Sequence, residues 1–410
     1  MDIAQAAEDG ARRSYGKLIA FLAARTRDVA GAEDALSEAF AAALVEWPAT
    51  GIPRSPEAWL LTVARRKQID TLRRRKMGDE LAAEMALLSD ELAPAVDDVM
   101  EIPDERLRLM FACAHPAIDA GVHAPLILQT VLGFDAATIG SAFLVAPATM
   151  GQRLVRAKNR IRQTGIPFRV PDRTELADRL DGVLEAIYAI YAEGWSDPAA
   201  TQARTRGLAE EAIWLGRLVV SLLPQEPAAL GLQSLMLHAE ARRDARRDAQ
   251  GEFIPLEQQD TARWDAALIE EAEDLLLRAS RMRATERFQL EAAVQSAHAM
   301  RRLTGCTDWS GIVLLYDALL QLTGSVVVAL NRAAAIARAQ GPAEGLTALN
   351  ALQEDRRLAE YQPYWAARAA LLSQCGDTSE AAEAYRLAIG LESDPAVRRY
   401  LQQQLASIKT

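Results

Sequence analysis

Clustered arginine and lysine side chains are the feature of this sequence with the clearest chemistry. Residues 54–76 carry eight basic and two acidic side chains, a net charge of +6. Trp59 lies on this segment together with three consecutive cations, Arg65, Arg66 and Lys67. Cations that neutralise phosphates beside an aromatic ring that stacks on bases suit single-stranded or melted DNA. A solvated basic helix with Trp59 in the core is the alternative interpretation.

The spacing of apolar residues predicts one helix from Trp59 to Arg75. The residues expected on its buried face are Leu60, Val63, Ile69 and Leu72. Proline and glycine punctuate residues 47–53, which predicts a loop between this helix and the preceding one. The basic side chains then lie on the face that stays open to solvent.

A second basic block, residues 106–169, carries eight basic and two acidic side chains, again a net charge of +6. Within it, residues 134–162 predict two helices joined by a tight turn. Asp135 suits the N-cap of the first helix, and Pro147 suits the first turn of the second, where a backbone N–H has no helical partner. Gly140 supplies a small residue where the helices cross. This is the helix-turn-helix pattern, whose second helix enters the major groove of DNA.

The second helix of this pair has two faces. Met150, Leu154 and Ile161 recur at helical spacing and are expected to face the core. The residues expected to face DNA are polar or cationic: Thr149, Gln152, Arg153 and Arg156, with Arg160 further along. An ordinary helical hairpin with a solvated arginine face is the alternative.

The net charge of the whole chain, −10, hides this asymmetry. Residues 79–105 carry ten acidic and no basic side chains, and residues 170–410 carry 34 acidic and 25 basic ones. Two basic blocks separated by an acidic segment form the electrostatic pattern of a protein that neutralises phosphates. The larger acidic half lacks such a block, so we expect it to contact proteins or peptides and not DNA.

No arrangement of residues predicts an enzyme, a cofactor or a metal site. The sequence has no phosphate-binding loop, no glycine-rich dinucleotide fingerprint and no recognisable nucleophile with its base. Cys113, His115 and His123 lie close together, but structural zinc needs four ligands. We expect a buried thiol and a helix-terminal histidine there instead. The acidic residues within 97–105 are expected to form a solvated linker and not a magnesium site.

Composition and periodicity predict an all-α protein. Half of its 410 residues are apolar, alanine and leucine dominate, and helical spacing recurs along the chain. A charged stretch at residues 241–259 predicts a long loop. No apolar run approaches the ~20 residues of a membrane helix, the N-terminal residues show no secretory signal, and three isolated cysteines suit a reducing cytoplasm.

Near the C-terminus, small, large and turn residues fall on the positions of a tetratricopeptide unit. These residues are Trp365, Ala369, Leu372, Gly376, Ala381, Tyr385 and Ala388. Gly341 precedes Gly376 by 35 residues in a similar setting, close to the repeat period. The sequence therefore predicts a helical-repeat-like domain.

Taken together, these segments resemble a sigma factor of the extracytoplasmic-function type, which binds core RNA polymerase and reads promoters. Residues 32–40 resemble the polymerase-binding segment of that family, and residues 59–75 resemble its promoter-melting helix, which also reads the −10 element. Residues 104–162 resemble its −35-reading domain. The C-terminal half resembles a subgroup with a fused tetratricopeptide-like domain, and this similarity rests on residues 184–188, 193–194 and 259–265.

The resemblance implies four regions and a role for each. They are a first reader domain at 1–76, an acidic linker at 77–103, a second reader domain at 104–169 and a C-terminal extension at 170–410. The first domain is expected to dock on the polymerase clamp through Asp34, Glu38 and Phe40. The residues expected at the −10 element are Trp59, Arg65, Arg66 and Lys67. The residues expected in the −35 major groove, beside the polymerase flap, are Thr149, Gln152, Arg153 and Arg156.

We further expect the C-terminal extension to regulate the reader domains in cis, and to offer a surface for a protein or peptide partner. Two other functions stay open at this point. One is a protein-interaction scaffold with degenerate DNA-binding domains. The other is a helix-turn-helix repressor that binds its operator without polymerase. Co-purification with core polymerase separates the sigma factor from both.

Overall fold

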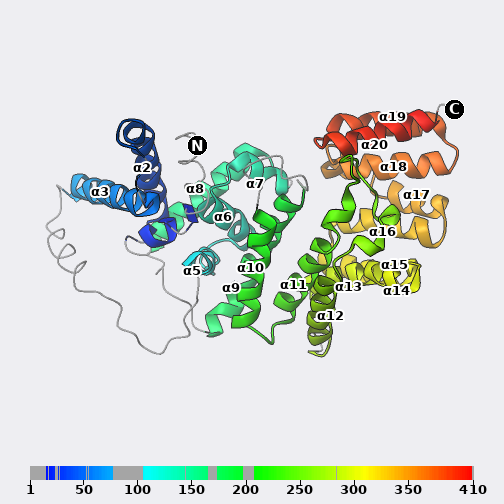
Figure 1. Ribbon diagram of the computed structural model, residues 1–410, viewed down its shortest axis with the longest axis horizontal. Helices are drawn as coiled ribbons and strands as arrows, with labels where there is room; N and C mark the ends of the chain where they lie inside the picture. Colours follow the sequence, from blue (N-terminus) through cyan, green and yellow to red (C-terminus); the bar gives the residue numbers. More distant parts are fainter. Residues whose placement is uncertain are drawn as a thin grey trace. The chain divides into compact units, whose positions relative to one another are not determined.

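The computed structural model describes residues 15–76, 105–164, 173–196 and 207–408, apart from residues 17, 24, 25, 27, 52, 54, 144 and 283. Over these ranges the chain forms helices, short 3₁₀ turns and one isolated bridge between Arg247 and Phe253 (Figure 1). The all-α prediction is confirmed. The chain divides into two compact units, residues 1–190 and 191–410. The expected acidic linker, residues 77–103, lies outside the described residues.

The first unit is built around α6 (Ala120–Leu132), a helix that is buried on nearly every side. It ends at Gly133, whose φ of 67° is the left-handed conformation of a helix C-cap. Helical residues within 15–23 pack against it, and a Cβ on Gly16 would lie 2.3 Å from the Val131 carbonyl oxygen, so glycine permits the approach. The other helices of this unit are α2 (Val29–Thr50), α3 (Pro56–Lys76), α5 (Glu105–Cys113), α7 (Ala136–Ala142), α8 (Pro147–Thr164) and the first part of α9 (Arg173–Ser196).

α2 is longer than the sequence pattern predicts. The expected loop at 47–53 is wrong at its start, because the helix continues through Trp47 and Pro48 and the loop begins only at Gly51. Trp47 is 1% exposed and packs edge-on against the Trp59 ring, which holds this last turn in helical form. Gly51, with φ of 82°, then ends the helix.

The first part of α9 completes the core of the first unit. Arg179 is 4% exposed and donates a hydrogen bond to the Phe111 carbonyl oxygen (3.3 Å). Gly182 lies so close to His123 that a Cβ there would approach the histidine Cβ to 2.6 Å. The compact unit extends to Ile190, whereas the sequence places the end of the second reader domain at residue 169.

The second unit is a succession of helices, each packed against its neighbours in chain order. They are α10 (Leu208–Leu222), α11 (Pro227–Glu240), α12 (Ala266–Ser280), α13 (Arg287–Ala299), α14 (Arg301–Thr304), α15 (Trp309–Thr323), α16 (Val326–Ala339), α17 (Pro342–Asn350), α18 (Gln362–Gln374), α19 (Thr378–Leu391) and α20 (Pro395–Ile408). The predicted tetratricopeptide positions fall on the hairpin of α18 and α19, where Gly376 makes the turn with φ of 87°. Ala369, Leu372, Ala381 and Tyr385 share one buried cluster there. The assignment of this hairpin to the tetratricopeptide class stays a prediction.

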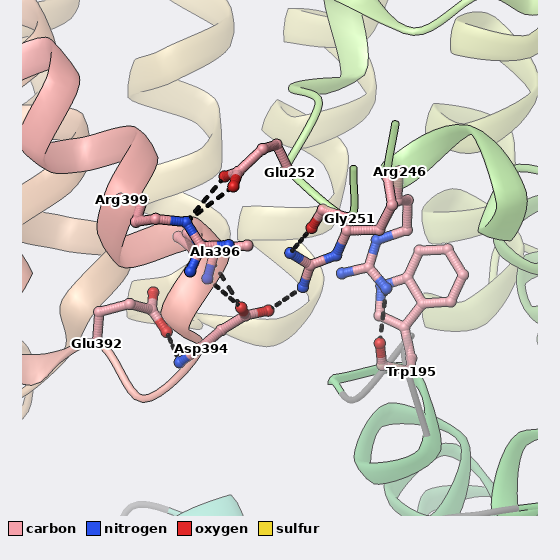
Figure 2. A network of polar contacts seen from close by, with 10 residues as sticks. Trp195, Arg246, Gly251, Glu252, Glu392, Asp394, Ala396 and Arg399 are labelled. Atoms are coloured by element: carbon pink, nitrogen blue, oxygen red, sulfur yellow. Dashed lines mark hydrogen bonds and ion pairs between the residues drawn. The ribbon is translucent and has the colours of Figure 1, made fainter. Parts of the chain in front are cut away.

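The long loop predicted at 241–259 separates α11 from α12 and contains two 3₁₀ turns, Arg243–Arg246 and Leu256–Gln258. Arginine side chains hold it in place (Figure 2). The Arg246 guanidinium lies 4.1 Å from the Trp195 ring centroid and donates a hydrogen bond to the Trp195 carbonyl oxygen (2.6 Å). The loop is thereby fixed to the last turn of α9.

The same loop is also fixed to the last helix of the second unit. Arg247 forms an ion pair with Asp394, just before α20, and Arg399 of α20 forms one with Glu252 (2.9 Å; Figure 2). Residues at both ends of the unit's sequence therefore meet on this loop.

Truncation tests whether α9 belongs to the first unit. We expect a fragment of residues 1–196 to melt cooperatively and at a higher temperature than a fragment of residues 1–169. The shorter fragment loses the buried apolar side chains of α9, among them Leu176, Leu180 and Val183, and burial of each of these is worth about 1.5–3 kcal/mol. Circular dichroism melts measure the difference. Equal midpoints for the two fragments would contradict the assignment.

Candidate nucleic-acid interface

α2 carries the three residues expected to bind polymerase. Asp34 and Glu38 are exposed and, being one turn apart, lie on the same face of the helix. Phe40 is half-buried and lies about 200° around the helix from Glu38. The structure therefore brings the two acids together on an open face and leaves Phe40 away from them.

Two of the expected DNA-binding residues of α3 are held by aromatic contacts. Trp59 is half-buried, and its ring meets that of Trp47 edge-on with the centroids 5.5 Å apart. Arg65 is half-buried, with its guanidinium 4.5 Å from the Phe21 ring centroid. Such a cation–π contact ties the basic helix to the N-terminal helical residues.

The next two cations of α3 are open to solvent. Arg66 and Lys67 are exposed, and Lys67 forms an ion pair with Glu38 of α2 (3.2 Å), in which both side chains are about half exposed. The pair thus joins a residue expected to bind DNA to one expected to bind polymerase. Arg66 and Lys67 are thus the exposed members of the trio, and Lys67 differs in its ion pair with Glu38.

The buried face of α3 differs in part from the prediction. Leu60, Ala64 and Gln68 are buried, a stripe that advances one turn at a time. Ile69 lies about 100° from this stripe and is 49% exposed, so its predicted burial is wrong. It lies one turn from Arg66 on the outer face.

α7 and α8 are joined by a turn, as the sequence predicts. The Asp135 carboxylate accepts a hydrogen bond from the Thr138 N–H (2.7 Å), and Pro147 is the first residue of α8. A Cβ on Gly140 would lie 2.5 Å from the Val145 carbonyl oxygen, so glycine lets the turn fold back against α7. The residues predicted to face inward are buried: Met150, Leu154 and Ile161.

The outer side of α8 presents all four residues expected in the major groove. They are Thr149, Gln152, Arg153 and Arg156, each of them exposed. Arg153, Arg156 and Arg160 also line a groove of about 430 Å³ whose other wall is the N-terminal end of α6, residues 117–122. Asp119, the N-cap of α6, also lines this groove, and its carboxylate accepts a hydrogen bond from the Gly121 N–H (2.9 Å). The three guanidinium groups outnumber this carboxylate and can attract phosphate oxygens.

A buried ion pair joins α2 to α8. The Lys158 ammonium lies 2.5 Å from the Glu33 carboxylate, and both side chains are nearly buried, at 14% and 15% exposure. Burial raises the pKa of Glu33, and the charge of Lys158 opposes that rise. Because 125 residues separate the partners, no local pattern in the sequence could have revealed this contact.

Cys113 and His123 have structural roles in the first unit. The Cys113 thiol is buried 3.5 Å from the Thr130 hydroxyl, and burial raises the pKa of Cys113 to about 12. The His123 Nε2 lies 3.1 Å and 3.0 Å from the carbonyl oxygens of His115 and Ile118. This ring therefore holds the turn before α6, and the thiol is not activated.

Comparison with known proteins assigns the first of these elements. Residues 11–77, which include α2 and α3, match sigma-70 region 2, a segment of sigma-70 family factors. Region 2 in such factors binds RNA polymerase and takes part in promoter recognition. Residues 179–280, which run from α9 to the end of α12, match a family of unknown function, DUF6596. No solved structure matches the chain.

One relative covers nearly the whole chain. An uncharacterized protein of Rhizobium meliloti (strain 1021) is 40% identical over 380 residues, which are 91% of this chain and 89% of that protein. The chain belongs to the same family as this protein. In the part that the structure describes, no helix is long and apolar enough to span a membrane.

The Glu33–Lys158 pair predicts a pH-dependent stability. Glu33 keeps its proton to higher pH in the folded chain than in the unfolded chain, whose ordinary pKa is 4.5. Its contribution to stability therefore falls as pH rises from 4.5 through the folded pKa. Lys158→Met removes the opposing charge, so we expect it to lower the free energy of unfolding by about 1–3 kcal/mol at pH 8 and by less at pH 5.

The matched control is Lys67→Met, which removes the exposed pair with Glu38. Exposed pairs contribute about 0–1 kcal/mol, so this variant should change little at either pH. Urea denaturation of both variants measures the difference. Equal effects of the two substitutions at pH 8 would show that the α2–α8 pair does not stabilise the fold.

Proposed function

We propose that this protein is a sigma-70 family factor of the extracytoplasmic-function type, and that it uses two separate basic helices, α3 and α8, to read a promoter. The observation that supports this most strongly is that a region 2 match and a second exposed basic helix, preceded by a tight turn, lie in one chain. Each helix presents exposed cations, Arg66 and Lys67 on α3 and Arg153 and Arg156 on α8. Such cations neutralise phosphates, and the accompanying side chains read bases.

The roles of the individual residues follow from their exposure. Asp34 and Glu38 offer an acidic face on α2 to the polymerase clamp, and Phe40 would meet the polymerase from the other side of the helix. At the −10 element, Arg66 and Lys67 contact the strand, Trp59 offers the edge of its ring, and Arg65 holds α3 against Phe21. At the −35 element, α8 inserts Thr149, Gln152, Arg153 and Arg156 in the groove, beside the polymerase flap.

The C-terminal half is proposed to be a tetratricopeptide-like domain that regulates the reader domains in cis and is required for their activity. Its acidic charge argues against DNA binding, and stacked helical hairpins form surfaces suited to proteins or peptides. A covalently attached domain acts at high effective concentration. A separate inhibitor is then unnecessary.

Promoter opening distinguishes the roles of the neighbouring arginines. Arg66→Ala should keep core-polymerase binding and the melting temperature, yet abolish permanganate-reactive thymines around the start site, because only the outward cation is lost. The double variant Arg65→Ala, Arg66→Ala should also lose opening and melt at a lower temperature, since the Phe21 contact goes as well. Unchanged permanganate reactivity in both variants would reject the role of α3.

The same transcription assay with core polymerase separates the alternatives. A scaffold would not support promoter-specific transcription, and a repressor would bind its operator without polymerase.

A fragment test addresses the C-terminal half. Since the first compact unit extends to Ile190, the fragment must keep α9, and residues 1–196 meet that condition. We expect this fragment to be helical and to bind core polymerase, but to support little transcription compared with the full chain. Circular dichroism checks its folding. Activity equal to that of the full chain would remove cis regulation.

A further inference from the structure

α8 divides its exposed residues between two directions. At about 100° per residue, Gln152 and Val155 lie opposite the buried side formed by Leu154 and Ala157, on the part of the helix farthest from the core. Arg153 lies about 100° from Gln152, toward the groove that α8 forms with the start of α6. Base edges and phosphates therefore face different residues when this helix enters a major groove.

Val155 is an unusual residue for this strip. It is 60% exposed, and two of its neighbours one turn away, Gln152 and Asn159, are polar. A single exposed apolar side chain needs no explanation by itself. What singles out Val155 is its position one turn after Gln152, on the strip that a helix-turn-helix protein aims at base edges.

The chemistry of the major groove supplies one apolar partner. Among the four bases, only thymine presents a methyl group there, and apolar side chains recognise it by contact. Gln152 can form hydrogen bonds with an adjacent base edge, but it cannot distinguish a methyl group.

The arginines on the flank suit a different task. Arg153 and Arg160 line the groove of about 430 Å³ beside residues 117–122, and neither forms an ion pair among the described residues. Arg156 and Asp119 line the same groove, and the Asp119 carboxylate accepts the Gly121 N–H at the start of α6 (2.9 Å). A phosphate on the α8 side of the groove would meet the guanidinium groups, three cations against one carboxylate. This placement favours backbone contact by Arg153 over base reading.

We propose that Val155 is a specificity-determining residue that reads the C5 methyl group of one thymine in the −35 element, while Arg153 and Arg160 hold the adjacent phosphates. The inference rests on the proposed function, namely that α8 reads DNA.

The test uses the full chain with core polymerase on promoters selected from a library randomised at the −35 element. The wild type should select thymine at one position, and deoxyuridine at that position, which lacks only the methyl group, should lower transcription by about threefold to tenfold. Val155→Ala should transcribe thymine and deoxyuridine templates equally, and Val155→Ile should retain the discrimination. Val45→Ala removes an exposed valine side chain on α2 (76% exposed) and should leave the discrimination unchanged.

Two further variants separate the inference from the function on which it rests. Arg153→Ala and Arg160→Ala should each weaken binding to all promoters alike and reduce the slope of log affinity against log salt by about one. Gln152→Ala should relax the preference at a neighbouring −35 position.

Persistent thymine preference in Val155→Ala, or no selected thymine in the wild type, would overturn the inference, even if Gln152→Ala still alters the −35 preference. If neither Gln152→Ala nor the arginine variants change promoter binding, the assignment of α8 as a reader fails as well.

Discussion

The first unit depends on the burial of α6 on all sides. A helix that is apolar around its whole circumference must be covered by other elements, and α6 is covered by α5, α7, α8 and the helical residues near the N-terminus. The start of α9 joins the same core, through the contact of Gly182 with His123 of α6. Packing on α6 fixes which side of α8 is buried, and the outer side is thereby determined. The exposed side of α8, which we propose to meet DNA, therefore consists of the residues that do not pack on α6.

Net charge gives an incomplete account of the cations available to DNA. Each basic block has a net charge of +6 in the sequence, yet several of its members have partners in the fold. Lys158 is nearly buried against Glu33, Lys67 pairs with Glu38, and Arg65 lies on Phe21. The first of these pairs sits in a low-dielectric environment where breaking it is costly, whereas the second is screened by solvent. Counting charges identifies the basic helices, but only packing shows which of their described cations are exposed to solvent.

Local signals in the sequence account for much of the first unit. The cap at Asp135, the start of α8 at Pro147 and the inward position of Leu154 each depend on residues within a few positions, and each is confirmed. The sequence-based predictions are wrong where contacts between distant segments determine the local structure. Ile69 is exposed because α2 covers a stripe of α3 that excludes it, and the extra turn of α2 forms because Trp47 meets Trp59. The contact between α2 and α8 joins residues too far apart for any periodicity to indicate.

A stack of helical hairpins has no single closed core, since each hairpin contacts only its neighbours. The loop between α11 and α12 alters this in the second unit. It binds Trp195 through Arg246, and it binds Asp394 and Arg399 near the other end through Arg247 and Glu252 (Figure 2). The two ion pairs each link residues 147 positions apart, and the one between Arg247 and Asp394 is partly shielded from solvent. The DUF6596 match ends at residue 280 and so includes the loop but not its partners on α20. Because the loop contacts residues near both ends of the unit, the second unit is not a simple chain of repeats in which each hairpin contacts only its neighbours.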